Sequence, residues 1–280
     1  MAFIGSTAFV VSGAVGLLLA GGFLAAPVLF PDLVSDVASP CDAKGTPLTP
    51  ASTDETDHRR ASEYRLSAPR DGAEVELCVG VGSIDILPHD AADVSVQVVV
   101  ESKGSGAAAR VADTVVQVSQ DAGGIRVLQT EAARAVWWFG GEGADVSVTV
   151  FVPRGLDAAY DARVDVGSIA GQGLRGMGPQ EWRVDVGDID VHYAAIAAGQ
   201  LRGVADVGDV RFDMPTGPGY RVDAATDVGD VSLELPGLRI VSYDEDPAGD
   251  HVIAETEGYA RAGTKVQLDL RVDVGDVTVS

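Results

Sequence analysis

The chain has 280 residues, of which 42 are acidic and 20 are basic, so its formal net charge at pH 7 is −22. A polyphosphate partner would be repelled by such a surface, and the charge therefore argues against nucleic-acid binding. Hydrophobic residues make up 46% of the chain, which excludes disorder throughout and allows a sizeable core.

The first thirty residues predict a membrane-spanning helix. The run from Ala8 to Phe30 carries no charged side chain, and the first such residue is Asp32. A helix of this length spans about 34 Å, enough to cross the hydrocarbon core of a bilayer. A cleaved signal peptide is the alternative for residues 1–30, although a basic n-region is missing. We expect a single-pass protein of the cell membrane whose C-terminal domain lies outside the cytoplasm.

Residues 31–62 predict an extended stem. The segment contains four prolines, with Ser and Thr between them, and it shows no apolar periodicity. Such a composition buries too little apolar area to offset the entropy of ordering the chain. We expect this stem to separate the anchor from the folded part.

Residues 63–160 predict a β-rich region. Polar and apolar residues alternate over 74–79, 93–98 and 145–150, which is typical of half-buried strands. The strands expected at 114–118 and 125–128 flank Asp121-Ala122-Gly123-Gly124, a sequence typical of a hairpin turn. No helical period follows the anchor, so the sequence predicts an all-β fold.

Residues 161–280 contain a short repeated phrase, Val-Gly-Asp/Ser-Ile/Val. The phrase also occurs once before this region, and its glycines are Gly82, Gly167, Gly187, Gly208, Gly229 and Gly275. From Gly167 onward the spacings are 20, 21, 21 and 46 residues, and Gly249-Asp250 suggests a degenerate copy within the last interval. A fixed period of this size predicts stacked units, here the coils of a β-solenoid.

Each copy predicts two short strands that meet at a Gly-Asp corner. In residues 183–191 the apolar positions are Val184, Val186, Ile189 and Val191, so the alternation breaks once, at Gly187-Asp188. Glycine supplies the backbone freedom that a sharp corner needs and lets the backbone of the next coil approach closely. We expect all four apolar side chains to point inward and these six glycines to be structural.

The repeated phrase resembles that of a bacterial family described as the "putative adhesin" domain, whose function is unknown. The family phrase is usually Ser-Gly-Ser-Gly-Asp-Val/Ile, and this chain keeps the final Gly-Asp-Val/Ile but has Asp-Val in place of the preceding small residues. The resemblance covers roughly residues 64–280. It implies a right-handed β-solenoid-like fold on cell-surface or envelope-stress-associated proteins, and it implies no catalytic residues.

The aspartates beside the corners form the clearest candidate site. Stacking would align them in two ladders, Asp185, Asp206, Asp227 and Asp273 in one, and Asp188, Asp209, Asp230 and Asp276 in the other. Carboxylates about 4.8 Å apart repel one another, and a bound Ca²⁺ would relieve that repulsion. The structural alternative is that Arg163, Arg183 and Arg271 neutralise part of the charge and that each aspartate bonds to turn N–H groups. We favour the structural alternative and expect no cofactor.

Two further features are candidates for contacts or cross-links. Trp137-Trp138-Phe139 precedes a Gly-Gly pair between two expected strands, where it either contacts a partner or caps an open end of the solenoid. Cys41 and Cys78 are the only cysteines, and an oxidising compartment favours a disulfide between them, with Cys78 on the outer face.

The sequence therefore predicts a non-enzymatic envelope protein that displays a β-solenoid for binding. Its expected contacts are the membrane, through the N-terminal helix, and a cell-wall polymer or a protein partner. The alternative is a secreted polysaccharide-active enzyme, since paired carboxylates on a β-solenoid can cleave glycosidic bonds. The aspartates here are repeated equivalents, whereas such an enzyme needs two carboxylates in unlike environments.

Overall fold

The computed structural model describes residues 46–67, 72–121, 123–129, 144–245 and 248–280, all within one compact unit, Ala43–Ser280. The expected membrane helix and the first part of the stem lie outside these residues. None of the helices in the described part of the chain has the length and apolar character needed to span a bilayer.

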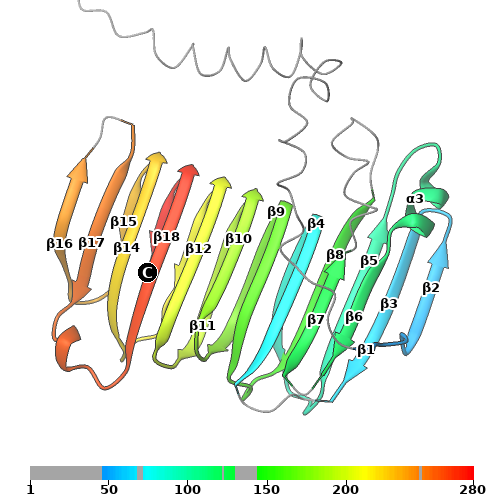
Figure 1. The fold of residues 1–280 in the computed structure, drawn as a ribbon, viewed down its shortest axis with the longest axis horizontal. Helices are drawn as coiled ribbons and strands as arrows, with labels where there is room; N and C mark the ends of the chain where they lie inside the picture. The colour runs from blue at the N-terminus through cyan, green and yellow to red at the C-terminus, as the bar shows by residue number, and fades with distance from the viewer. Residues whose placement is uncertain (1–45, 68–71, 122, 130–143, 246–247) are drawn as a thin grey trace, which may run out of the picture. The chain divides into compact units, whose positions relative to one another are not determined.

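The described residues form a mixed sheet of 19 strands with a short α-helix and a 3₁₀ turn (Figure 1). The elements of the N-terminal part are β1 (Thr46–Pro47), β2 (Ser52–Thr56), β3 (Arg59–Leu66), β4 (Ala73–His89), β5 (Val94–Glu101), α3 (Ala107–Asp113), β6 (Val116–Gln120), β7 (Gly124–Gln129) and β8 (Asp145–Pro153). Those of the repeat region are β9 (Ala158–Gly176), β10 (Gln180–Val186), β11 (Ile189–Ile196), β12 (Gly199–Val207), β13 (Val210–Asp213), β14 (Gly219–Val228), β15 (Val231–Leu233), β16 (Leu238–Glu245), β17 (Asp250–Thr256), η2 (Tyr259–Arg261), β18 (Lys265–Val274) and β19 (Val277–Val279).

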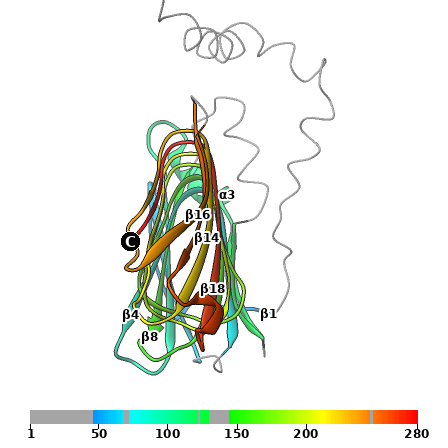
Figure 2. The same cartoon turned by 90° about the vertical axis from the view of Figure 1, so that its left-hand side faces the viewer.

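The strands lie in two rows, because the two halves of β4 and of β9 pair with different strands. The first row runs β1, β6, β7, β4, β9, β10, β12, β18, β14, β17 and β16. The second row runs β2, β3, β5, β8, β4, β9, β11, β13, β19 and β15. Figure 2 looks along the rows and shows strands on both sides of a narrow interior. From β4 to β14 all neighbours in the first row are parallel.

A single hydrophobic core fills the interior from Tyr64 to Val279. Alternation within the strands supplies it: in β10, for example, Trp182 and Val184 are fully buried. Trp182 donates a hydrogen bond from Nε1 to the Tyr193 hydroxyl (2.9 Å), which in turn donates to Oε1 of Gln180 (2.6 Å). This network links β10 of the first row to β11 of the second, so it fixes how the two rows face each other.

Most of the expected strands are confirmed. The alternating segments at 74–79, 93–98 and 145–150 lie in β4, β5 and β8. The expected hairpin is formed by β6 and β7, and Oδ1 of Asp121 accepts hydrogen bonds from the N–H groups of Gly123 (2.7 Å) and Gly124 (3.1 Å). An aspartate that bonds to the backbone two and three residues later stabilises a turn, which explains why the hairpin could be predicted.

The sheet begins at Thr46, within residues 31–62, the segment expected to form the stem. The antiparallel hairpin of β2 and β3 occupies Ser52–Leu66. Every residue of β2 is exposed, so this edge strand carries no apolar alternation that a sequence pattern could reveal. The expected boundary between residues 160 and 161 falls inside β9, and one core spans both sides of it.

The all-β prediction holds except for α3, a helix of about two turns. Ala107 and Val111 are its buried residues, one helical turn apart, and the helix contacts β3 and β5. Seven residues are too few to show a helical period in the sequence.

The repeats do not stack in sequence order. The last copy, in β18 and β19, lies between the copy in β12 and β13 and the copy in β14 and β15. The prediction of a degenerate copy at Gly249-Asp250 is wrong, because this segment leads into β17, which runs antiparallel to β14. The interval between Gly229 and Gly275 is occupied by the antiparallel hairpin of β16 and β17.

Candidate interaction surface

The corner glycines form a continuous column along one edge of the sheet. All six have positive φ values, between +132° and +142°. A Cβ atom on Gly187 would lie 1.6 Å from the carbonyl oxygen of Gly167, and one on Gly208 would lie 1.9 Å from that of Gly187. Both the backbone conformation and the close approach of the neighbouring strand therefore require glycine at these positions.

The aspartates that follow these glycines bond to one another's backbone. Oδ1 of Asp188 accepts a hydrogen bond from the N–H of Asp209 (3.0 Å). In the same way Asp209 accepts from Asp276 (2.9 Å), and Asp276 accepts from Asp230 (2.9 Å). The ladder follows the spatial order of the strands. Each carboxylate thus satisfies the N–H of the next corner, which supports the structural role expected for these aspartates.

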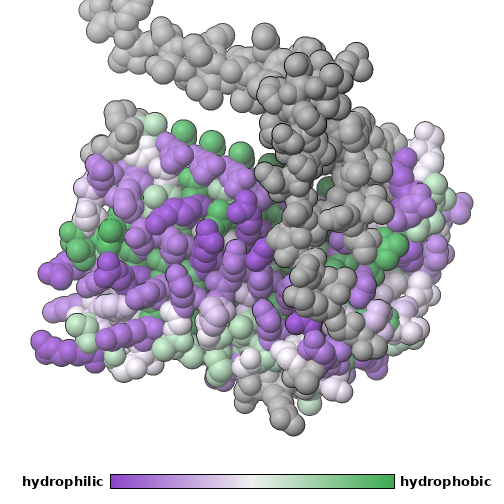
Figure 3. Space-filling model, in the orientation of Figure 1, coloured by the Kyte–Doolittle hydropathy of each residue, from purple (hydrophilic) through white to green (hydrophobic). Residues whose placement is uncertain are grey.

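The valines that precede the corner glycines are exposed. We name Val186, Val207, Val274 and Val228 the corner ridge; they lie on adjacent strands, and their exposed fractions are 47%, 46%, 47% and 51%. The prediction that Val186 points into the core is wrong, because the chain turns directly after it and the interior ends there. Figure 3 shows hydrophobic atoms in a line along the upper edge, near the ends of β14, β18 and β12 in Figure 1.

A second ladder of aspartates lies directly before the corner ridge in the sequence and consists of Asp185, Asp206, Asp273 and Asp227. Arg183 contacts two of them, with its Nε 3.2 Å from Asp185 Oδ1 and its Nη2 3.5 Å from Asp206 Oδ1. Burial raises the pKa of Asp206, and the charges of Asp185 and Asp273 on the neighbouring strands raise it further, against the opposing effect of Arg183. The exposed valines are therefore flanked by carboxylates on both sides.

The other two arginines expected beside these aspartates contact different carboxylates. Arg163 lies 3.0 Å from Asp161 and 3.5 Å from Glu181. Arg271 lies 2.9 Å from Asp223 and 3.0 Å from Asp269. These ion pairs cover the outer face of the first row, one step farther from the corner than expected.

The calcium alternative requires several ligand oxygens to converge on one point. In the described parts of the chain, no group of three or more His, Cys, Asp or Glu side chains is placed to hold a metal ion. Oδ1 of Asp188, Asp209 and Asp276 already accepts a backbone hydrogen bond.

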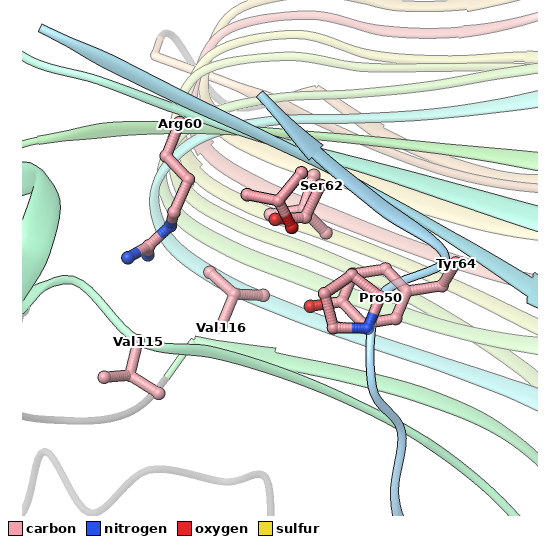
Figure 4. A pocket seen from close by; sticks show the side chains of 8 residues that line it. Pro50, Arg60, Ser62, Tyr64, Val115 and Val116 are labelled. Atoms are coloured by element: carbon pink, nitrogen blue, oxygen red, sulfur yellow. The ribbon is translucent and has the colours of Figure 1, made fainter. Parts of the chain in front are cut away.

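Two shallow hollows lie at opposite ends of the sheet. The N-terminal one, of about 270 Å³, lies between β3 and β6 (Figure 4) and is lined by Pro50, Thr53, Arg60, Ser62, Tyr64, Val98, Val115 and Val116. These lining residues include no carboxylate, whereas glycosidases usually act through a pair of carboxylates. The other, of about 320 Å³, is lined by Ala225, Thr226, Asp227, Asp244, Gly249, Asp250, His251 and Arg271. In the second hollow, Asp250 is held by the Tyr243 hydroxyl (3.0 Å) and the Val231 N–H (3.4 Å).

Two expected features fall wholly or partly outside the described residues. Trp137, Trp138 and Phe139 are outside them, and so is Cys41. Cys78 forms a disulfide bond. Its side chain alternates with the inward-pointing Leu77 and Val79, yet it is only 7% exposed, so the outer face is covered at this point.

Comparison with known proteins supports a shared fold. No family model and no curated protein matches the chain. A solved structure described as a "putative cell adhesion protein" from Clostridium sporogenes matches 78% of this chain and 98% of its own length, with a TM-score of 0.55 and 11% identity. The chain shares the fold of that structure. The resemblance to the adhesin family is thereby confirmed at the level of the fold, and identity this low shows nothing beyond it.

Two other solved structures are similar over comparable lengths. A "putative adhesin" from Bacteroides fragilis covers 79% of this chain and 97% of its own, with 11% identity and a TM-score of 0.29. A "putative lipid binding protein" from Parabacteroides distasonis covers 79% and 96%, with 10% identity and a TM-score of 0.24. TM-scores this low carry no argument about this chain.

Proposed function

We propose that the protein is a non-enzymatic, adhesin-like module, held at the cell membrane by an N-terminal single-pass helix and displayed outside the cytoplasm. We further propose that its stacked repeats are coils of a right-handed β-solenoid whose corner edge is the binding surface. The observation that carries this proposal is the corner ridge, in which valines about half exposed recur on four adjacent strands.

The chemistry of the corner edge favours an extended partner. Parallel strands lie about 4.8 Å apart, so the ridge offers the same apolar contact at regular short intervals. The flanking aspartates and the net charge of −22 disfavour anionic polymers. A neutral cell-wall glycan or a basic protein segment is the partner class that fits this edge.

Binding to isolated cell-wall material tests the proposal. The full chain is purified in a mild detergent and sedimented with wall fragments, and the double variant Val207→Asn/Val274→Asn should lose at least tenfold in affinity. Both valines are exposed, so the melting temperature should change little. Val115→Asn is the matched control, because Val115 is 50% exposed but lies away from the ridge. Equal binding by the ridge variant and the control would show that the ridge is not the contact surface.

Proteolysis tests the proposed topology separately. Protease added to intact, wall-stripped cells that express the full chain should degrade residues 46–280. Complete protection, with degradation only after the membrane is permeabilised, would contradict display outside the cytoplasm.

A further inference from the structure

The two ends of the sheet differ in how their edge strands are protected. At the N-terminal end, β1 contains Pro47, which cannot donate a ladder hydrogen bond, and β2 is fully exposed and carries Asp54 and Glu55. Proline and charge are the usual means by which proteins prevent pairing at a sheet edge. At the C-terminal end, β16 pairs with β17 on one side and with no other described strand.

The β16 edge exposes large apolar side chains, whereas β2 at the other end of the sheet exposes none. Ile240, Val241 and Tyr243 are 61%, 55% and 50% exposed, and they lie close together on one short strand. Figure 3 shows hydrophobic atoms gathered at the left-hand end, where Figure 1 places β16. Monomeric proteins rarely leave an apolar edge strand uncovered.

This exposure arises because the first row extends beyond the second. The first row continues past β14 into β17 and β16, whereas the second row ends at β15, whose one partner among the described strands is β19. Ile240 pairs with Ala254 and Tyr243 pairs with Val252, and both partners are buried, so the two exposed side chains lie on the core-facing side of the sheet. A bulge between Ile240 and Ser242 turns Val241 out of the regular pleat. The core-facing side of β16 thus projects past the strand that would cover it.

The sequence of β16, Leu-Arg-Ile-Val-Ser-Tyr-Asp-Glu, is complementary to itself in the antiparallel direction. With a two-fold axis between Val241 and Ser242, Arg239 of one copy lies opposite Asp244 of the other, and Ile240 lies opposite Tyr243. Opposite charges and aromatic–aliphatic pairs are the cross-strand pairs that stabilise antiparallel strands. We propose that two copies of this chain associate through their β16 strands, which joins their first rows into one continuous sheet.

A head-to-tail arrangement is disfavoured by charge. A head-to-tail contact would place β16, which carries Asp244 and Glu245, against the end of the sheet that holds β1 and β2, where Asp54 and Glu55 of β2 add charge of the same sign. Head-to-tail contacts would also propagate into open fibres, whereas the two-fold contact closes after two copies. The proposed dimer does not depend on the proposed binding function, because the corner ridge lies on other strands.

Charge exchange tests the dimer, with sedimentation velocity of the full chain in a mild detergent as the measurement. A single strand pair gives a small interface, so concentrations from about 1 to 200 µM are needed. Arg239→Glu alone and Asp244→Arg alone each create two like-charge contacts across the axis and should shift the protein to monomer. An equimolar mixture of the two variants pairs opposite charges at both contacts and should restore the dimer.

Two further measurements keep the outcome decisive. Ile240→Asn should weaken the wild-type dimer at least tenfold, and the melting temperatures of all three variants should stay close to that of the wild type, because the altered side chains are exposed. A wild-type protein that remains monomeric throughout would overturn the proposal. So would a mixture that stays monomeric while both variants are folded, or association that all the variants leave unchanged, as an interaction between anchors would.

Discussion

Replacement of the corner glycine Gly208 by alanine should come close to unfolding the protein. Gly208 has a φ of +135°, and a side chain in such a conformation costs about 1–3 kcal/mol. The new Cβ would also lie 1.9 Å from the carbonyl oxygen and 2.6 Å from the carbonyl carbon of Gly187. Relief of that overlap requires the two strands to separate at the corner, where Asp209 and Asp188 are hydrogen-bonded. We expect a loss of more than about 4 kcal/mol, a large part of the stability of a typical domain.

Two other glycines separate the contributions of strain and overlap. Gly217 has a φ of +117° but nothing within 4 Å of its Cβ position, so Gly217→Ala should show the strain alone, about 1–3 kcal/mol. Gly263 has open space and no positive φ, so Gly263→Ala should be neutral or stabilise by up to about 1 kcal/mol. Urea denaturation followed by circular dichroism measures all three. The reasoning fails if Gly208→Ala destabilises the protein no more than Gly217→Ala does.

Three further predictions concern buried hydroxyls and corner carboxylates. Tyr193→Phe should lower the free energy of unfolding by about 1–3 kcal/mol, because it leaves an indole N–H and an amide oxygen unpaired in the core. Tyr160→Phe should instead be neutral or stabilising, because that buried hydroxyl has no hydrogen-bond partner among the described residues. Asp206→Asn should raise the free energy of unfolding at pH 7 by less than about 1 kcal/mol, and the melting temperature with it. Burial raises the pKa of this carboxyl, so its charge destabilises the folded state. That gain should vanish as the pH falls through the raised pKa to below the unfolded value of about 3.9; a constant gain would contradict the assignment. Asp209→Asn should leave the free energy of unfolding nearly unchanged, and Asp209→Ala should lower it by about 1 kcal/mol, since only the asparagine keeps an acceptor for the next corner N–H. A calcium-dependent rise in melting temperature, lost in Asp209→Asn and not reproduced by NaCl, would instead establish metal binding.

The sequence predicted the corners because their requirements are local. The break in alternation at Gly187-Asp188 marks the corner within a single copy, and the recurrence of that break sets the register between copies. The turn at Asp121 could be predicted for the same reason, since the aspartate bonds to backbone two and three residues away. By contrast, the partner of Asp188 is the N–H of Asp209 on the next strand, and only the stacked structure reveals it.

The exposed surfaces could not be predicted, because exposure depends on where the two rows end. Val184 and Val186 share one side of β10 and look equivalent in the sequence. Val184 is fully buried and Val186 is 47% exposed, since the interior ends at the corner. Ile240 likewise alternates as a core residue would, but it is 61% exposed because none of the described strands of the second row lies opposite it.

The spatial order of the repeats depends on side chains outside the repeated phrase. The strands β12, β14 and β18 all end in Asp-Val and are followed by Gly-Asp-Val, so the corners alone cannot determine which strand lies beside β12. The faces of the strands do differ. Arg271 on β18 lies 2.9 Å from Asp223 on β14, a contact that requires these two strands to be adjacent, and β17 occupies the other edge of β14. The strand β18, which lies between β12 and β14, is therefore the last strand of the first row in the sequence. Its Gly-Asp corner must fit between the corners that follow β12 and β14, which have the same sequence.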